Sequence, residues 1–284
     1  GVFAPFSFKM GNSLSGSRGK DKNLQRGKSV VQQKIARAGV AGQLNLDGQG
    51  LKTLPPQVLA VERLKNLSIR NNKLKALPEE IGAVFPQLKH LSVDANALEE
   101  LPSLLGLTRL THLSASDNQL MATGLVALPG SLTKLELEGN PLGVVPDVVY
   151  QLLPNLTSLN LTRTSLAQLP EDFGLQLLQL EELFLDSNAL EAVPESFAAM
   201  GQLKILSMKL NRIGPKTKEE GQPIPEAFFE ATAVQSLELE GNPLTKEALM
   251  EFDGIQAFSA RRVALKNKSI SGGTMVEFDF CGLD

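Results

Sequence analysis

The 284-residue chain contains no tryptophan, one tyrosine, two histidines and a single cysteine, Cys281. One cysteine cannot form an intramolecular disulfide, and no apolar run of the signal-peptide type is present. Both features favour a reducing compartment, so we expect an intracellular protein that is cytoplasmic or peripheral to a membrane, with an organelle or a cilium as alternatives. No segment is long and apolar enough to cross a bilayer.

The sequence also lacks the motifs of common catalytic sites. It has no phosphate-binding glycine loop with its lysine, no cysteine–histidine pair and no G-x-S-x-G motif. Acidic pairs such as Glu136 and Glu138 recur at a regular period, which is typical of a surface and not of an acid–base pair. We therefore expect no enzymatic activity, no cofactor and no small-molecule substrate.

A phrase of the form L-x-x-L-x-L-x-x-N-x-L returns about every 23 residues between Leu44 and Leu244. The clearest copies are LKNLSIRNNKL (64–74), LKHLSVDANAL (88–98), LTHLSASDNQL (110–120), LTKLELEGNPL (132–142), LEELFLDSNAL (180–190) and VQSLELEGNPL (234–244). The phrase resembles the leucine-rich repeat, and the resemblance covers about three-quarters of the chain. It implies an α/β solenoid, a horseshoe of eight or nine repeats with a concave parallel β-sheet, helical or 3-10 convex segments and a helical cap at each end.

The positions within the phrase predict which side chains are buried. The alternation L-x-L predicts short strands with one buried face, and the asparagine that follows can satisfy backbone groups in the turn. Gln49 and Thr164 replace that asparagine, so we expect the first and sixth turns to be less well satisfied. A proline step then precedes an apolar residue by three positions, which we expect to line the convex side of the core: Val58, Ile81, Leu105, Val149, Phe173, Phe197 and Phe228.

Composition and local signals divide the chain into five parts. They are a flexible basic leader (1–28), a capping helix (29–40) begun by Ser29 and stopped by Gly39, the solenoid (41–244), a helical cap (245–270) begun by Thr245, and a tail (271–284). Residues 1–37 hold eight Lys or Arg against one Asp, whereas the remainder is acidic, which disfavours nucleic acid as a partner. A long interval inserts residues 214–225 after the seventh strand, and we expect them beside Phe184 and Ile205.

Two large apolar residues, Phe184 and Ile205, occupy concave positions of adjacent repeats. Charged concave residues surround them: Glu136, Glu138, Glu182, Asp186, Lys209, Glu238 and Glu240. An aromatic and an aliphatic side chain inside an acidic rim are typical of a protein-binding hot spot, so we predict a partner with a basic and partly apolar surface. The alternative is that both are isolated exposed side chains.

His90 and His112 occupy the same column of consecutive strands, and Asp94 lies close enough in the pattern to be a third metal ligand. An open sheet does not enclose an ion, so we favour two stacked surface histidines and no metal site.

The segment Met10-Gly11-Asn12-Ser13-Leu14-Ser15 satisfies the N-myristoylation pattern and is similar to the M-G-N-S start of short intracellular leucine-rich-repeat proteins. The pattern is used only if Gly11 becomes the first residue, and nine residues precede Met10 here. An acyl chain with the basic leader would give peripheral membrane contact. The alternative is an unmodified basic leader.

The sequence therefore predicts an adaptor or scaffold that holds a partner protein on its concave face. The alternative is a permanent structural subunit of a large ciliary or organellar assembly. The two differ in whether the leader and tail stay mobile or are ordered against neighbouring proteins.

Overall fold

The computed structural model describes residues 30–215, 221–270 and 281–283 of the chain. The expected leader, the cap residue Ser29 and the lipidation candidate Gly11 lie outside these residues. Within the described part, no helix has the length and apolar character that crossing a bilayer requires.

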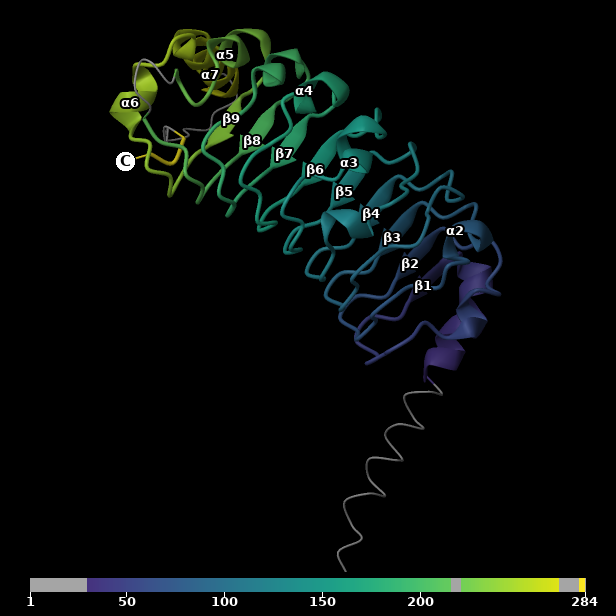
Figure 1. Cartoon of the computed structure of the whole chain (residues 1–284). Coiled ribbons are helices and arrows are strands. Elements are labelled where there is room, and N and C mark those ends of the chain that lie inside the picture. Colours follow the sequence, from purple (N-terminus) through teal and green to yellow (C-terminus); the bar gives the residue numbers. More distant parts are fainter. Residues whose placement is uncertain (1–29, 216–220, 271–280, 284) are drawn as a thin grey trace, which may run out of the picture.

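Nine short strands form one parallel sheet, in which each strand pairs with the next one along the chain (Figure 1). The strands are β1 (Gln43–Asn45), β2 (Asn66–Ser68), β3 (His90–Ser92), β4 (His112–Ser114), β5 (Lys134–Glu136), β6 (Ser158–Asn160), β7 (Glu182–Phe184), β8 (Ile205–Ser207) and β9 (Ser236–Glu238). The register is the same throughout the sheet: the central leucine of each strand pairs with the central leucine of the next. The predicted solenoid with a parallel sheet is confirmed.

Short helical segments return the chain on the opposite side of the core (Figure 1). They are η1 (Pro56–Val58), α2 (Ile81–Val84), η2 (Ala122–Gly124), α3 (Asp147–Gln151), α4 (Phe173–Gln176), η3 (Glu195–Ala199) and α5 (Glu226–Ala231). The third repeat crosses this side in turns without a helix. The inward residues are buried, as the alternation predicts; Leu67, Ile69 and Leu91, for example, are at most 1% exposed.

The convex side of the core contains a row of stacked rings. Tyr150, Phe173, Phe197, Phe228, Phe229 and Phe258 follow one another with centroid separations of 5.4 to 6.4 Å. The phenylalanines of the repeat are therefore packing residues, as expected. Leu105 is the exception among the predicted convex core residues, because it is 58% exposed and Leu104 is buried instead. The third repeat is one of the short ones, so its return segment places the preceding residue against the core.

The asparagine of each turn links two repeats. The side-chain amide of Asn72 donates to the carbonyls of Ile69 and Leu46, the latter in the preceding repeat, at 2.9 Å each. Its Oδ1 accepts from the amide nitrogen of Leu51 at 3.0 Å. Equivalent bonds recur at the other asparagines of the column.

Thr164 replaces this asparagine without leaving the turn unsatisfied. Its hydroxyl donates to the carbonyl of Leu161 at 2.6 Å. The amide nitrogen of Leu142, which an asparagine would have bound, donates to the backbone carbonyl of Asn140 at 2.9 Å instead. The expectation of a poorly satisfied sixth turn is therefore wrong, because a local backbone bond replaces the side chain.

Helices cover both ends of the core. The N-terminal helix spans residues 30–41 and buries Val31 and Ala38 against the first repeat. It does not stop at Gly39 as expected. The stop is Gly42, whose φ of +67° suits glycine and whose N–H still bonds to the carbonyl of Ala38 at 2.8 Å.

At the other end, Thr245 begins α6 (Lys246–Met250) by accepting from the amide nitrogen of Ala248, and α7 (Ile255–Ile270) follows. Leu249 and Phe258 are buried and Phe252 is partly buried. The expected tail is not wholly outside the fold, because Cys281 and Leu283 are buried. The carbonyl of Cys281 accepts from the amide nitrogen of Leu239 at 2.8 Å and so covers the edge of the sheet beyond β9.

The insertion 214–225 follows β8, the eighth strand and not the seventh. Its described ends pack away from the concave face. The side chain of Gln222 bonds to the backbone of Asp253, between α6 and α7, and the carbonyl of Pro223 accepts from the amide nitrogen of Val193. The expectation that the insertion lies beside Phe184 and Ile205 is not met by these described ends.

Candidate protein-binding surface

Phe184 and Ile205 lie diagonally across neighbouring strands of the concave face. Glu182 of β7 pairs with Ile205 of β8, and Phe184 pairs with Ser207, so the two apolar residues are offset by two positions. Such diagonal neighbours are about 7–8 Å apart, within reach of one bound side chain. Both are half-buried, while the flanking Ser207 is only 1% exposed. The sheet therefore brings them together as predicted.

Three carboxylates of the acidic rim have cationic partners on the same face. Glu136 pairs with Lys134 at 3.0 Å and Glu238 with Lys209 at 2.6 Å. Glu138 pairs with Arg163 at 2.9 Å. The sequence pattern missed Arg163, because it lies in a turn and not at a strand position. The C-terminal half of the concave face remains acidic, with six carboxylates against Lys134, Lys209 and Arg163.

These contacts shift the titration of the paired groups. The hydrogen bond from Lys209 lowers the pKa of Glu238 and in turn raises the pKa of Lys209, so both groups stay charged over the neutral range. Burial alone would raise the pKa of Glu136, but hydrogen bonds from Lys134 and Ser114 hold it below the ordinary value.

Glu182 and Asp186 bond to neutral groups. Glu182 accepts from the hydroxyl of Ser158 at 3.0 Å. Asp186 accepts from the hydroxyl of Ser207 and from the amide nitrogen of Lys209, in the next repeat, at 2.6 and 2.8 Å. Neither carboxylate forms an ion pair with a described residue, and both lie on the same face as Phe184.

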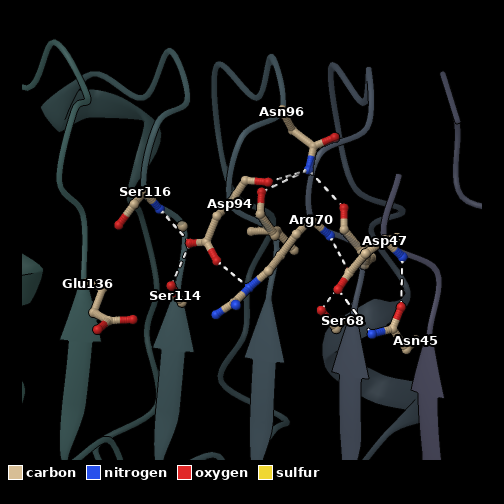
Figure 2. Close-up of polar contacts among 12 residues, drawn as sticks. Asn45, Asp47, Ser68, Arg70, Asp94, Asn96, Ser114, Ser116 and Glu136 are labelled. Atoms are coloured by element: carbon tan, nitrogen blue, oxygen red, sulfur yellow. Dashed lines mark hydrogen bonds and ion pairs between the residues drawn. The ribbon is translucent and has the colours of Figure 1, made fainter. Parts of the chain in front are cut away.

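The bonds of Asp186 belong to a recurring device, shown in its N-terminal copies in Figure 2. Asp47 accepts from the hydroxyl of Ser68 and the amide nitrogen of Arg70, and Asp94 accepts from the hydroxyl of Ser114 and the amide nitrogen of Ser116. We call this arrangement the Asp–Ser clasp. Each clasp joins one repeat to the next across the concave surface. The sequence carries a signal for it, an aspartate after one strand and a serine in the next.

The two histidines stack as expected, with ring centroids 4.5 Å apart in an edge-to-face arrangement. Asp94 does not join them. Its carboxylate is held by the clasp and by the guanidinium of Arg70 at 2.7 Å. Among the described residues, no three metal-ligating side chains are grouped to hold an ion.

The far end of the acidic rim borders a polar cavity of about 250 Å³. Lys209, Glu238 and Glu240 line it from the sheet, and Arg262, Cys281 and Gly282 close it from the C-terminal cap. The rim is thus continuous with the cap and does not end at β9.

The chain matches a family model described as leucine rich repeat over residues 62–120, 130–190 and 154–213. Two solved structures share its fold. A leucine-rich-repeat protein of Leptospira interrogans is 27% identical, with a TM-score of 0.58 over 77% of this chain and 58% of that one. A chain of the Toll–Spatzle complex of Drosophila is 24% identical, with a TM-score of 0.59 over 72% of this chain and 27% of that one.

The chain therefore spans less than two thirds of the length of either structure. None of the curated proteins matches it.

Proposed function

Since the chain belongs to the leucine-rich-repeat family, whose members generally mediate protein–protein interaction, we propose that it is a non-catalytic adaptor. Its partner protein binds the C-terminal half of the concave face, centred on Phe184 and Ile205. The adaptor works by positioning that partner, and not by changing it chemically.

One observation carries this proposal. Among the described residues that β1–β9 direct to the concave side, Phe184 and Ile205 are the only large apolar ones. A rigid sheet holds them as diagonal neighbours, so a bound side chain would lose little additional freedom in contacting both. Serine, asparagine and charged side chains surround them, which is the composition of a hot spot with a polar rim.

The ion pairs refine the expected charge of the partner. Because Glu136, Glu138 and Glu238 are compensated on the same face, the charge available to a partner is concentrated at Glu182, Asp186 and Glu240. A single basic group next to an apolar side chain fits this site better than an extensive basic surface.

The test is a comparison of two variants in native complexes. The full-length chain and its Phe184→Ala, Ile205→Ala double variant are purified from cells, and co-purifying proteins are quantified by cross-linking mass spectrometry. A direct partner should bind the double variant at least about 30-fold more weakly, which corresponds to about 2 kcal/mol.

Leu210→Ala is the matched control, because Leu210 is exposed on the turn that follows β8. Partners whose recovery is unchanged in the double variant, or lost equally in the control, would show that the concave half is not the binding site.

We also propose that the adaptor is tethered to a membrane through N-myristoylation of Gly11, supported by the M-G-x-x-x-S pattern and the basic residues after it. Intact mass spectrometry of the native protein tests this. A chain that begins at Gly11 with a tetradecanoyl increment is expected, and a native N-terminus upstream of Gly11 contradicts the tether.

A further inference from the structure

Five consecutive repeats each expose at least one apolar side chain on the convex side. The residues are Val84, Leu105, Val126, Leu152 and Leu175, and their exposed fractions lie between 37% and 65%. None is needed to fill the core, because each of these repeats already buries other apolar residues on the same side: Ile81, Leu104, Leu125, Val149 and Phe173. We call the five exposed residues the convex stripe.

Contacts between neighbouring repeats place the segments that carry the stripe next to one another. A Cβ at Gly106 would lie 3.6 Å from the Cα of Ala83, beside Val84. The amide nitrogen of Leu104 donates to the carbonyl of Ala127 at 3.0 Å, which joins the segments that carry Leu105 and Val126.

Side-chain contacts join the remaining segments. The side-chain amide of Asn155 donates to the carbonyl of Gly130 at 2.8 Å, and the rings of Tyr150 and Phe173 stack at 6.1 Å. The five segments that carry the stripe therefore follow one another along the convex side, behind β2 to β6 (Figure 1).

The charge beside the stripe is mainly negative. The convex segments of these repeats contain one cation, Arg109, and five carboxylates: Glu79, Glu80, Asp147, Glu171 and Asp172. Glu80 and Glu171 each precede a stripe residue by four positions, one turn of helix. None of the five forms an ion pair with a described residue, in contrast to Glu136, Glu138 and Glu238 of the concave rim.

Local helix energetics explain only part of this pattern. A carboxylate in the first turn of a helix is favourable, which accounts for Asp147 at the start of α3. It does not account for the exposed apolar residues, which a solvated surface has no reason to keep over five repeats.

The charge also selects among the molecules that cover apolar surfaces. An isologous contact with a second copy would place carboxylates against carboxylates, and an anionic membrane surface would repel the same groups. A surface that is both cationic and apolar would complement the carboxylates and also cover the apolar residues of the stripe.

We propose that the convex stripe is a second docking surface, which binds a basic amphipathic helix of a partner protein. The apolar side of that helix lies along the stripe and its lysines or arginines face the convex carboxylates. This surface is separate from the concave site, so the protein holds two partners, or two parts of one partner, on opposite sides of a rigid core.

The test uses the full-length chain and a fluorescent leucine–lysine peptide of about 18 residues, about 27 Å long as a helix. Binding is measured by anisotropy against two control peptides. One has the same composition in an order that destroys the amphipathic pattern, and the other has glutamate in place of lysine. We expect only the basic amphipathic peptide to bind.

The variants locate the site. Leu152→Ser with Leu175→Ser changes two exposed residues and should weaken peptide binding at least about tenfold, whereas Phe184→Ala with Ile205→Ala should change it less than about twofold. If the peptide bound the concave face, Phe184→Ala with Ile205→Ala would weaken binding more than the serine variant. Failure of the convex proposal can therefore be told apart from failure of the proposed concave site.

Three results would overturn the proposal. Equal binding of the scrambled peptide would show that binding depends on net charge alone and not on an amphipathic helix. Sedimentation that shows a dimer abolished by the serine variant would assign the stripe to a second copy. Binding of anionic vesicles that the serine variant loses would assign it to a membrane.

Discussion

Replacing Asn118 with alanine should lower the free energy of unfolding by about 3 kcal/mol, although the residue contacts no partner and lies outside both proposed surfaces. Its side chain is 6% exposed. The side-chain Nδ2 of Asn118 donates to the backbone carbonyls of Val93 and Ala115 at 3.1 and 3.0 Å. Its Oδ1 accepts from the backbone N–H of Leu98 at 3.1 Å. These bonds join the third and fourth repeats.

The magnitude follows from which groups keep another partner. The carbonyl of Val93 retains the amide of Asn96 at 2.8 Å, and that of Ala115 retains the amide of Asn140 at 3.0 Å. Leu98 has no other acceptor among the described residues, so its buried N–H is left unsatisfied, at a cost of about 1–3 kcal/mol. The lost bonds and the small cavity add about 1 kcal/mol.

Equilibrium urea unfolding, followed by far-ultraviolet circular dichroism, measures the loss. Gln119→Ala is the control, because Gln119 is exposed and adjacent. Asn118→Asp separates this explanation from lost volume. The carboxylate keeps an acceptor for Leu98 but places a second oxygen against the carbonyls, so this variant should be less stable than alanine at neutral pH.

That carboxyl should have a raised pKa in the folded state. The folded form therefore gains from protonation, and Asn118→Asp should recover stability as the pH falls through the folded pKa. A loss below about 1 kcal/mol for alanine, or an aspartate variant as stable as the parent at neutral pH, would refute the account of the turn.

Three further predictions test the packing, the histidine pair and the covered edge. Gly106→Ala should lower the free energy of unfolding by about 1–3 kcal/mol, because the new Cβ would clash with the carbonyl oxygen of Gly82. Gly39→Ala is the control, because a Cβ there meets nothing within 4 Å, and thermal unfolding compares the two variants. Burial, together with the nearby His90 and Lys134, lowers the pKa of His112, so the unfolded chain binds a proton that the folded chain does not. Stability should therefore fall as the pH drops below about 6.5, and His112→Gln should remove that part of the fall in urea titrations at two pH values. Deleting residues 281–284 bares the amide nitrogen of Leu239 and removes two buried side chains, so sedimentation should show concentration-dependent association; a monomeric deletion would contradict the role given to Cys281.

The periodic part of the fold could be predicted because every repeat buries its apolar residues in the same way. A three-residue strand buries its central leucine only when its neighbours stack in register, so the period alone determines the sheet, its order and its inner face. Phe173 and Phe197 could be assigned to the core for the same reason, since a column that recurs at one spacing on the return segment lies against its neighbours.

The errors occur where the repeat length or the local backbone departs from the pattern. Counting from Pro102 predicts Leu105 in the core, but the third return segment is short and buries Leu104. Gly39 has the right identity for a helix stop, yet Gly42 has the positive φ and the bond to Ala38. Both outcomes depend on how the chain packs in three dimensions, which cannot be obtained by counting residues along the sequence.

The Asp–Ser clasps could not be found by examining one repeat at a time. Asp94 and Ser114 become partners only because adjacent strands keep the same register, and neither residue alone differs from an ordinary polar surface position. The same holds for Arg163, whose turn position brings it to Glu138 only after the repeats have stacked.

Such lateral contacts change what the two faces offer to a partner. On the concave face, strands in register bring cations and hydroxyls to most carboxylates, so Glu238 already has Lys209 at 2.6 Å and a binding partner would have to compete for it. On the convex face the return segments differ in length, and Glu80 and Glu171 find no cation within the described residues. Since an uncompensated charge gains more from a complementary partner than one already paired, formal acidity counted from the sequence overestimates the concave face as a site for basic partners and underestimates the convex one.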